Sequence, residues 1–423
     1  MKTSTVIVGL QWGDEGKGKI VDFLSQKVDY VVRFNGGNNA GHTVSLNGQQ
    51  FKFHHLPSGA ISGKKLLIGQ GEVINPKILL EEISYLEKQK IKVDLLIDFR
   101  THIVMPYHQA LDAATERWKG EKATGSLKLG IGYCYEDKNN RLGIRLEDLV
   151  RPEILAQKIK EIFPLKKAII EKVFGQKVNI GVSQIVEEYT KYGQSIKKYE
   201  ADVSAIVNYY LGKKKFLFES AHGTFLDPAF GTYPFTVAPS CLSGAVFSSV
   251  GFGPVGLDVI GVVKAYTTRV GNGPFVTEQK NKSGEIMQKV GQEIGTTSGR
   301  VRRCGWLDLP MLKNAVMWNG CRQLVLTKLD VLSQFPKIPI CTHYLFQKKK
   351  YEYFPPEINR LPKCQPVYKE LKGWNVPISK IKNYQDLPKE CRRYVEFIEK
   401  ELKVPIIYIS NGRERGEMIC KRK

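Results

Sequence analysis

The sequence predicts an α/β fold with a large, mostly parallel central sheet flanked by helices. Short β-branched or apolar runs, of the kind that form strands buried on both faces, recur along the chain. Patterns with helical spacing fall between these runs, and strands that alternate with helices are typical of parallel sheets. The predicted strands are residues 5–10, 30–34, 65–68, 94–97, 257–263, 323–327 and 405–409. The predicted helices are residues 77–88 (opened by Pro76), 107–118, 147–173, 285–292, 309–318 and 387–402.

The chain of 423 residues is longer than most single domains, but its 42% of hydrophobic residues can fill one sizeable core. The sequence contains no internal repeat and no long Pro/Gly/Ser-rich linker that would divide it. We therefore expect one large domain over residues 1–423. Within it, long loop or helical regions are expected at about 100–200 and 270–305, with long loops around the active site.

The charge is strongly positive, because 64 Lys and Arg against 42 Asp and Glu give a net charge of +22. Such a chain could bind nucleic acid or several phosphate-bearing small molecules. No aromatic RNA-binding motif, zinc finger or heptad-linked basic region accompanies the charge, so a nucleic-acid partner is not expected. The eight cysteines form no C-x-x-C pair, and no run of 18 apolar residues occurs. We expect a cytoplasmic protein without a membrane span.

A glycine-rich turn follows the first predicted strand and leads into a helix. Gly13, Gly16 and Gly18 allow successive backbone N–H groups to point at one anion. Lys17 and Lys19 add positive charge, and the helix offers the positive end of its dipole. The turn is therefore predicted to be a P-loop-like phosphate loop. It differs from a standard Walker A loop because no Ser or Thr follows the lysine.

Two carboxylates lie inside this anion-binding loop. Asp14 and Glu15 would repel a phosphate unless a cation or a proton transfer uses them. Asp14 could ligate Mg²⁺, act as a general base, or do both. The alternative is an acidic turn that packs against Lys17 and Lys19.

Residues 33–44, RFNGGNNAGHTV, contain three glycines, three asparagines and one histidine after a strand. This composition suits a backbone that approaches a ligand closely. His42 stands between Gly41 and Thr43 with little local side-chain packing, so we favour a hydrogen-bonding or acid role beside phosphate over a core histidine.

Two further segments carry recognition chemistry. Asp330 in TKLD (residues 327–330) could accept hydrogen bonds from guanine N1 and its 2-amino group, while Lys328 covers the ring; a solvated strand end is the alternative. The segment GTTSGRVRRCGW (residues 295–306) combines hydroxyls with three arginines. Guanidinium groups bind carboxylates in bidentate fashion, so this loop suits a small dicarboxylic acid, with a basic surface loop as the alternative.

GDEGKGK followed about twenty residues later by NNAGHT resembles the motifs of the adenylosuccinate synthetase family, and the resemblance continues through nearly the whole chain. It implies a ligase that joins L-aspartate to IMP at the expense of GTP, giving adenylosuccinate, GDP and phosphate. The implied route passes through 6-phosphoryl-IMP, and the implied cofactor is Mg²⁺.

The resemblance also implies roles for individual residues. Catalytic roles fall on Asp14, Lys17 and His42, and the metal ligands are Asp14 and the carbonyl of Gly41. GTP contacts fall on Gly13, Glu15, Gly16, Gly18, Lys19, Gly41, Thr43, Lys328, Asp330, Ser410 and Gly412. IMP contacts fall on Asn39, Ser126, Leu127, Arg141, His222, Val237 and Arg300, and aspartate contacts on Thr296, Thr297, Arg300 and Arg302. Arg141 would reach the nucleotide of a neighbouring subunit, so a homodimer is implied.

The sequence departs from the family pattern on the side of the acceptor nucleotide. His222 stands where the family usually has glutamine, Leu127 where a threonine is common, and Val237 begins VAPSCLSG in place of a hydroxyl-rich stretch. An alternative is therefore a paralogue that ligates aspartate to another 6-oxopurine nucleotide, for example GMP or dGMP. A GTP-binding switch is a further alternative, although a switch would not need the arginine-containing segment 295–306, which suits a dicarboxylic acid.

Overall fold

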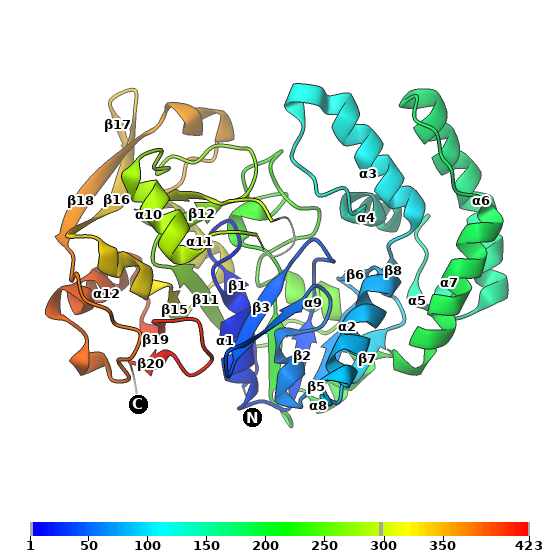
Figure 1. The fold of residues 1–423 in the computed structure, drawn as a ribbon, viewed down its shortest axis with the longest axis horizontal. Helices are drawn as coiled ribbons and strands as arrows, with labels where there is room; N and C mark the ends of the chain where they lie inside the picture. The colour runs from blue at the N-terminus through cyan, green and yellow to red at the C-terminus, as the bar shows by residue number, and fades with distance from the viewer. Residues whose placement is uncertain (1–2, 296–298, 422–423) are drawn as a thin grey trace.

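The computed structural model describes residues 3–295 and 299–421, and its centre is a ten-stranded sheet (Figure 1). The strand order is β20-β19-β15-β11-β1-β10-β2-β5-β7-β9. All neighbouring pairs are parallel except β19 and β20, which are antiparallel. The strands are β1 (Thr5–Gly9), β2 (Tyr30–Arg33), β5 (Lys65–Ile68), β7 (Asp94–Asp98), β9 (Glu200–Ala201), β10 (Phe216–Glu219), β11 (Asp258–Lys264), β15 (Gln323–Thr327), β19 (Ile406–Ser410) and β20 (Met418–Cys420). The predicted fold class is confirmed, and all seven predicted strands belong to this sheet.

Helices cover both faces of the sheet because its strands are apolar on both sides. Along β1, Val6 and Val8 belong to one hydrophobic cluster, whereas Ile7 between them belongs to the other. The longer helices are α1 (Lys17–Ser25), α2 (Pro76–Lys88), α3 (Pro106–Lys119), α4 (Ile131–Asn140), α6 (Pro152–Ala168), α7 (Val182–Ile196), α8 (Val203–Tyr210), α10 (Lys282–Gly291), α11 (Leu309–Asn319) and α12 (Lys389–Leu402). Residues of α1, α2, α6 and α7 share the cluster of Ile7, and those of α8, α11 and α12 share the other.

Several elements differ from the prediction, and helices α4, α7 and α8 lie outside the predicted helix ranges. The predicted helix 147–173 is broken into α5 (Leu146–Leu149), α6 and a π-helical turn, Ile169–Val173, because Pro152 lacks an N–H and starts a new helix. Helix α10 begins at Lys282, three residues before the predicted start, since the Asn281 side chain caps it by accepting from Ser283 N. Strand β10 was not predicted at all, although it lies between β1 and β2 at the centre of the sheet.

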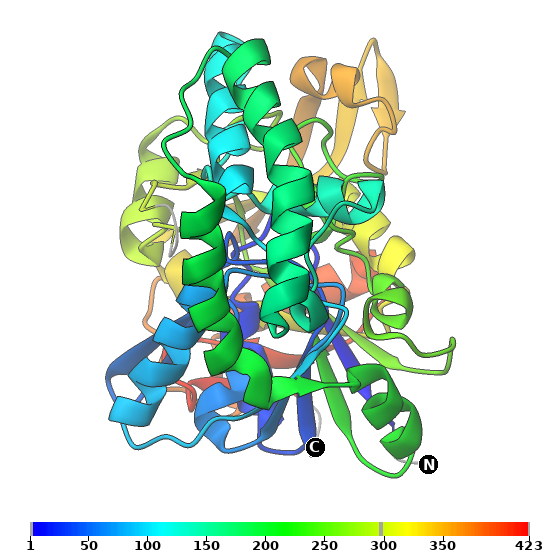
Figure 2. The same cartoon turned by 90° about the vertical axis from the view of Figure 1, so that its right-hand side faces the viewer.

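A second, smaller sheet was also not predicted. It consists of β14 (Leu307–Asp308), β16 (Lys337–Phe346), β17 (Lys349–Tyr351) and β18 (Gln365–Lys372), which form one side of the molecule in Figure 1. On the opposite side, α6 and α7 stand side by side in front of the sheet in Figure 2, within the helical region expected at about 100–200. The remaining strands are β3 (His42–Leu46), β4 (Gln49–Phe53), β6 (Val73–Ile74), β8 (His102–Ile103), β12 (Thr267–Arg269) and β13 (Arg303–Gly305). Over the part of the chain that the structure describes, no helix is both long and apolar enough to span a bilayer.

Candidate active site

Loops that leave the carboxyl ends of parallel strands meet at one edge of the central sheet, where open α/β sheets usually bind ligands. The predicted phosphate loop follows β1, the segment with three asparagines follows β2, and His222 follows β10. The TKLD segment follows β15, and the C-terminal loop follows β19. The fold therefore brings together motifs that are far apart in the sequence.

Glu15 is the internal anchor of the loop after β1. Its carboxylate is fully buried and accepts hydrogen bonds from Gln11 N at 3.0 Å and Gly13 N at 2.9 Å. The second oxygen lies 2.6 Å from Lys17 Nζ. Gly13 and Gly16 both have a φ of 84°, which favours glycine and lets the loop fold tightly around this carboxylate. The acidic-turn interpretation therefore describes Glu15 and Lys17.

Asp14 points elsewhere. Its backbone is also left-handed, with a φ of 57°, and its Oδ2 lies 2.5 Å from Arg302 Nε. The Asp14 side chain is 33% exposed, whereas Arg302 is buried. The loop after β1 and the segment that carries Arg302 thus meet directly. A carboxylate predicted to serve as base or metal ligand faces an arginine predicted to bind aspartate.

Lys19 turns away from the phosphate loop. Its Nζ donates to Ser410 Oγ, Gly412 O and Glu417 O, each at 2.8 Å. Burial lowers the pKa of Lys19 to about 8, although Glu417 and Asp330 act in the opposite direction. Lys19 therefore connects α1 to the C-terminal loop, and Ser410 and Gly412 are brought to the predicted GTP site through it.

His42, at the start of β3, is not the loosely packed side chain that its small neighbours suggested. It is 6% exposed, and its Nδ1 lies 2.8 Å from Glu219 Oε1 and 3.2 Å from Ser58 Oγ. Burial lowers the pKa of His42, while Glu219 opposes this shift. The packing comes from β10 and from the 3₁₀ helix η1 (Ser58–Ser62), which local sequence does not reveal.

Several buried polar atoms beside this site have no hydrogen-bond partner among the described residues. They are Arg33 Nη1, Asn38 Oδ1, Asn39 Oδ1 and both ring nitrogens of His222. Burial together with Lys17 and Arg33 lowers the pKa of His222 to about 3, so the ring is neutral at physiological pH. A Cβ atom on Gly36 would lie 3.4 Å from Arg33 Nη2 and 3.5 Å from His222 Cε1, so both side chains flank Gly36. Buried polar atoms normally have partners, so these atoms are candidates for contact with a ligand or with water.

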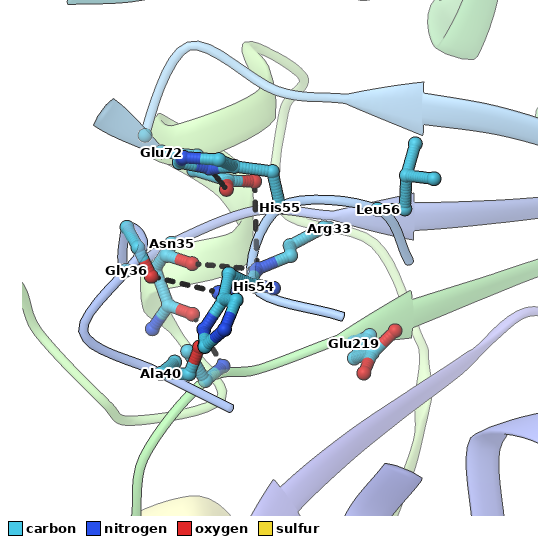
Figure 3. Close-up of polar contacts among 12 residues, drawn as sticks. Arg33, Asn35, Gly36, Ala40, His54, His55, Leu56, Glu72 and Glu219 are labelled. Carbon is cyan, nitrogen blue, oxygen red and sulfur yellow. Dashed lines mark hydrogen bonds and ion pairs between the residues drawn. The ribbon is translucent and has the colours of Figure 1, made fainter. Parts of the chain in front are cut away.

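A buried polar network surrounds the backbone near Gly36 (Figure 3). Arg33 Nε lies 3.4 Å from Glu72 Oε2, and His55 Nδ1 lies 2.8 Å from Glu72 Oε1. Arg33 Nη2 donates to Gly37 O at 3.3 Å, and the His54 ring contacts Ala40 O at 3.1 Å. Burial raises the pKa of Glu72 to about 8, against the effect of Arg33. Sequence reasoning found the loop but not the network beneath it.

The predicted phosphate contacts of the acceptor nucleotide lie on a loop held by Glu116. The Glu116 carboxylate accepts from Thr124 Oγ1 at 2.8 Å, Gly125 N at 2.9 Å and Ser126 N at 3.0 Å. Burial opposes ionisation, but these hydrogen bonds lower the pKa of Glu116 below its usual value. Ser126 and Leu127 are half-buried on this loop, and Arg300 Nη1 donates to Gly125 O at 3.3 Å.

The remaining predicted IMP contacts lie further out. Val237 is half-buried, and its N–H donates to Leu226 O at 2.9 Å. Arg141 is exposed at the C-cap of α4, with a φ of 64°. Its position on the surface leaves it accessible to another molecule.

On the predicted guanine side, Lys328 has its ammonium 3.2 Å from Glu293 Oε1 and 2.5 Å from Gly291 O. Burial raises the pKa of Asp330 on the 3₁₀ helix η6 (Leu329–Gln334), with Lys328 and Lys19 acting against the shift. Glu293 also binds the buried Lys264 at 2.9 Å. These contacts fix the Lys328 ammonium between Glu293 and Gly291.

The three arginines of the 295–306 segment have different environments. Arg303 binds both oxygens of Glu278, at 2.7 and 2.6 Å, and holds strand β13. Arg302 faces Asp14, and Arg300 is exposed. The predicted aspartate contacts Thr296 and Thr297 lie outside the described residues. The sequence could not show which arginine has a structural partner.

Comparison with known proteins assigns the chain to a family. The adenylosuccinate synthetase family model matches residues 6–419 of this chain. The chain belongs to the adenylosuccinate synthetase family. The adenylosuccinate synthetase of Acetivibrio thermocellus is 45% identical over 418 residues, which cover 98% of each protein. The structure of the fully ligated adenylosuccinate synthetase from Plasmodium falciparum superposes with a TM-score of 0.93 at 36% identity, covering 99% of this chain and 100% of that one.

A more distant structure shares the fold. The succinoaminodeoxyadenylate synthetase of cyanophage S-2L, bound to dGMP and dATP, has a TM-score of 0.62 at 18% identity, covering 100% of this chain and 96% of that chain. The adenylosuccinate synthetases are much closer to this chain in sequence. The expected enzyme class, a GTP-dependent ligase that joins aspartate to IMP, is confirmed by the family assignment.

Proposed function

We propose that the loops at the carboxyl edge of the sheet carry out this ligation through a 6-phosphoryl intermediate. The observation that supports it is the 2.5 Å approach of Arg302 Nε to Asp14 Oδ2. It places an arginine suited to a dicarboxylic acid next to the carboxylate of a phosphate loop. A nucleotide base bound between these loops would have both groups at its reacting edge.

In the first step, Asp14 accepts the N1 proton of the purine, and O6 attacks the γ-phosphate of GTP, releasing GDP. His42 donates a hydrogen bond to the leaving β-phosphate oxygens, and Lys17 and the loop amides stabilise the transferring phosphoryl group. In the second step, the amine of aspartate attacks C6, and phosphate leaves with the O6 oxygen. Arg302, with Arg300 and the hydroxyls of Thr296 and Thr297, binds the aspartate.

The other proposed ligand contacts are those that the family resemblance implies. GTP lies on Gly13, Glu15, Gly16, Gly18 and Thr43, and its base lies between Lys328, Asp330 and the Ser410 and Gly412 loop, to which Lys19 is bonded. The acceptor nucleotide contacts Asn39, Ser126, Leu127, His222, Val237 and Arg300. Arg141 reaches the acceptor phosphate of the partner subunit in a homodimer.

The residues present fit a magnesium ion. Mg²⁺ usually takes only one or two protein oxygens and completes its shell with substrate phosphates and water. The Asp14 carboxylate and the Gly41 carbonyl are hard oxygen donors of this kind, and within the described residues no cluster of three or more His, Cys, Asp or Glu forms an all-protein metal site. The ion would supply charge neutralisation for the phosphates.

The identity of the nucleotide that receives aspartate depends on His222. This residue presents two ring nitrogens without partners among the described residues, where the family usually has a glutamine. In its neutral form His222 offers one donor and one acceptor, and a glutamine amide also offers both. We therefore favour IMP, with GMP or dGMP as the alternative.

The test is phosphate release from GTP with Mg²⁺, aspartate and one nucleotide chosen from IMP, GMP and dGMP. The proposal requires release that depends on both aspartate and the nucleotide, with the highest kcat/KM for IMP. A higher kcat/KM for GMP or dGMP would reassign the acceptor. Release that needs neither aspartate nor an acceptor would instead indicate a GTP-hydrolysing switch.

A further inference from the structure

Glu219 ends strand β10 directly beneath His42. The strand is central in the sheet, and Glu219 pairs in register with Ile7 of β1 and Arg33 of β2. The side chain is completely buried, so its carboxylate must be satisfied by protein groups.

The structure satisfies both oxygens of this carboxylate. Oε2 accepts from Ser58 N at 2.8 Å, and Oε1 accepts from Ser58 Oγ at 2.5 Å. Oε1 also lies 2.8 Å from His42 Nδ1. The two Ser58 contacts fix the carboxylate, because η1 carries both the N–H and the hydroxyl and is itself packed against β2 through Gly59.

The contact between a carboxylate and one ring nitrogen of histidine determines the other nitrogen. An ionised carboxylate only accepts hydrogen bonds, so His42 Nδ1 must carry the proton that it donates. The ring plane and the position of Nε2 are then set by β10 rather than by the flexible glycines around His42. A histidine between Gly41 and Thr43 has no local feature that would hold its ring.

We propose that Glu219 is a positioning residue that holds His42 with Nδ1 protonated and directs Nε2 toward the phosphate chain. This inference rests on the proposed role of His42 in phosphoryl transfer. Glu219 itself does not touch the substrate and acts only through the imidazole. Such carboxylate–histidine pairs fix the orientation of the ring with little further loss of side-chain entropy, because the carboxylate is already immobilised.

The test combines a spectroscopic and a kinetic measurement on the full chain. In protein labelled with ¹⁵N-histidine, the His42 signals are assigned from their loss in His42→Asn. The wild type is expected to show a protonated Nδ1. In Glu219→Gln the Ser58 N–H needs the amide oxygen as its acceptor, so the amide NH2 group faces Nδ1, and the expected result is loss of the single Nδ1-protonated form.

The kinetic expectation is a fall in kcat of about 10²-fold in Glu219→Gln, the scale of a mispositioned acid–base group, with KM for GTP within about threefold of wild type. Glu219→Asp keeps the charge and should recover part of kcat. Asp308→Asn, which also converts a buried carboxyl to an amide but lies on the second sheet, is the matched control and should retain wild-type turnover.

An unchanged His42 signal in Glu219→Gln would overturn the proposal whatever its activity, and so would unchanged turnover in the same variant. Folding is checked by circular dichroism; if Glu219→Gln does not fold, Glu219→Asp is read by the same two measurements. Failure of the proposed function itself is seen separately, as near-normal turnover in His42→Asn, because the ring signals do not depend on activity.

Discussion

Asp308 provides a test of the electrostatics of the interior, and the informative change is Asp308→Asn. The carboxyl is 1% exposed and caps α11 by accepting from Met311 N at 3.2 Å. The Tyr344 hydroxyl lies 2.6 Å from each of its oxygens. Burial raises the pKa of Asp308 from 3.8 to about 7, although these hydrogen bonds oppose the shift. Asparagine is as good a helix cap as aspartate, so the substitution removes the titration and preserves the cap.

The raised pKa of Asp308 determines whether the free energy of unfolding rises or falls with pH. Between pH 3.8 and pH 7 the folded protein keeps a proton that the unfolded chain has lost, so the stability contributed by this proton declines as the pH rises. The pKa rises by about 3 pH units, which at about 1.36 kcal/mol per unit corresponds to about 4 kcal/mol in all. Between pH 5 and pH 7 wild type should lose about 2–3 kcal/mol relative to Asp308→Asn.

The assay is urea unfolding of both proteins at several pH values from 5 to 8, with the free energy of unfolding compared at each pH. Other groups titrate equally in the two proteins, so the difference isolates Asp308. Parallel curves for wild type and variant would refute the reasoning, because they would mean that Asp308 has the same pKa in the folded and unfolded chains.

Three further substitutions test the active site. Asp14→Asn should lower kcat by about 10²-fold or more, because the proposed general base is lost; near-normal aspartate-dependent phosphate release would remove Asp14 from the mechanism. Lys19→Met removes three hydrogen bonds to the C-terminal loop, and KM for GTP should rise about tenfold with little change in the KM for IMP. An equal rise in both KM values would argue against this localised role. Asp330→Asn should raise KM for GTP by about 10- to 100-fold, since an amide cannot accept both of the proposed guanine hydrogen bonds, and a gain with xanthosine triphosphate in the same assay checks the assignment.

The fold class could be predicted because parallel strands buried on both faces leave a strong signal. The runs that became β1, β11 and β15 are almost entirely apolar or β-branched, and no other element with that composition fits their length. Strand β10 escaped prediction because FLFE is short, has no β-branched residue and ends in a charge. Its place in the sheet follows from its partners β1 and β2, which periodicity does not identify.

In the candidate site too, the sequence does not identify contacts between residues that are far apart in the chain. The glycine-rich loop and Asp14 could be found because their chemistry is local and their composition unusual. Glu219 could not, since its significance arises from contacts with His42 and with Ser58, which is 161 residues away in the sequence. The sequence indicated that the Lys19 ammonium lies near a phosphate, whereas in the structure it donates hydrogen bonds to the C-terminal loop. Sequence reasoning identifies reactive groups more readily than the groups that hold them.

The ion pair between Asp14 and Arg302 has a thermodynamic consequence. A ligand that binds Asp14 separates its carboxylate from Arg302. A ligand that binds Arg302 separates the guanidinium from Asp14 in the same way. The ligand that binds second finds the contact between Asp14 and Arg302 already broken, so the dissociation constants of the two ligands are coupled. Linkage requires this coupling to be reciprocal: whatever factor the nucleotide complex contributes to aspartate affinity, aspartate contributes to that of the nucleotide complex.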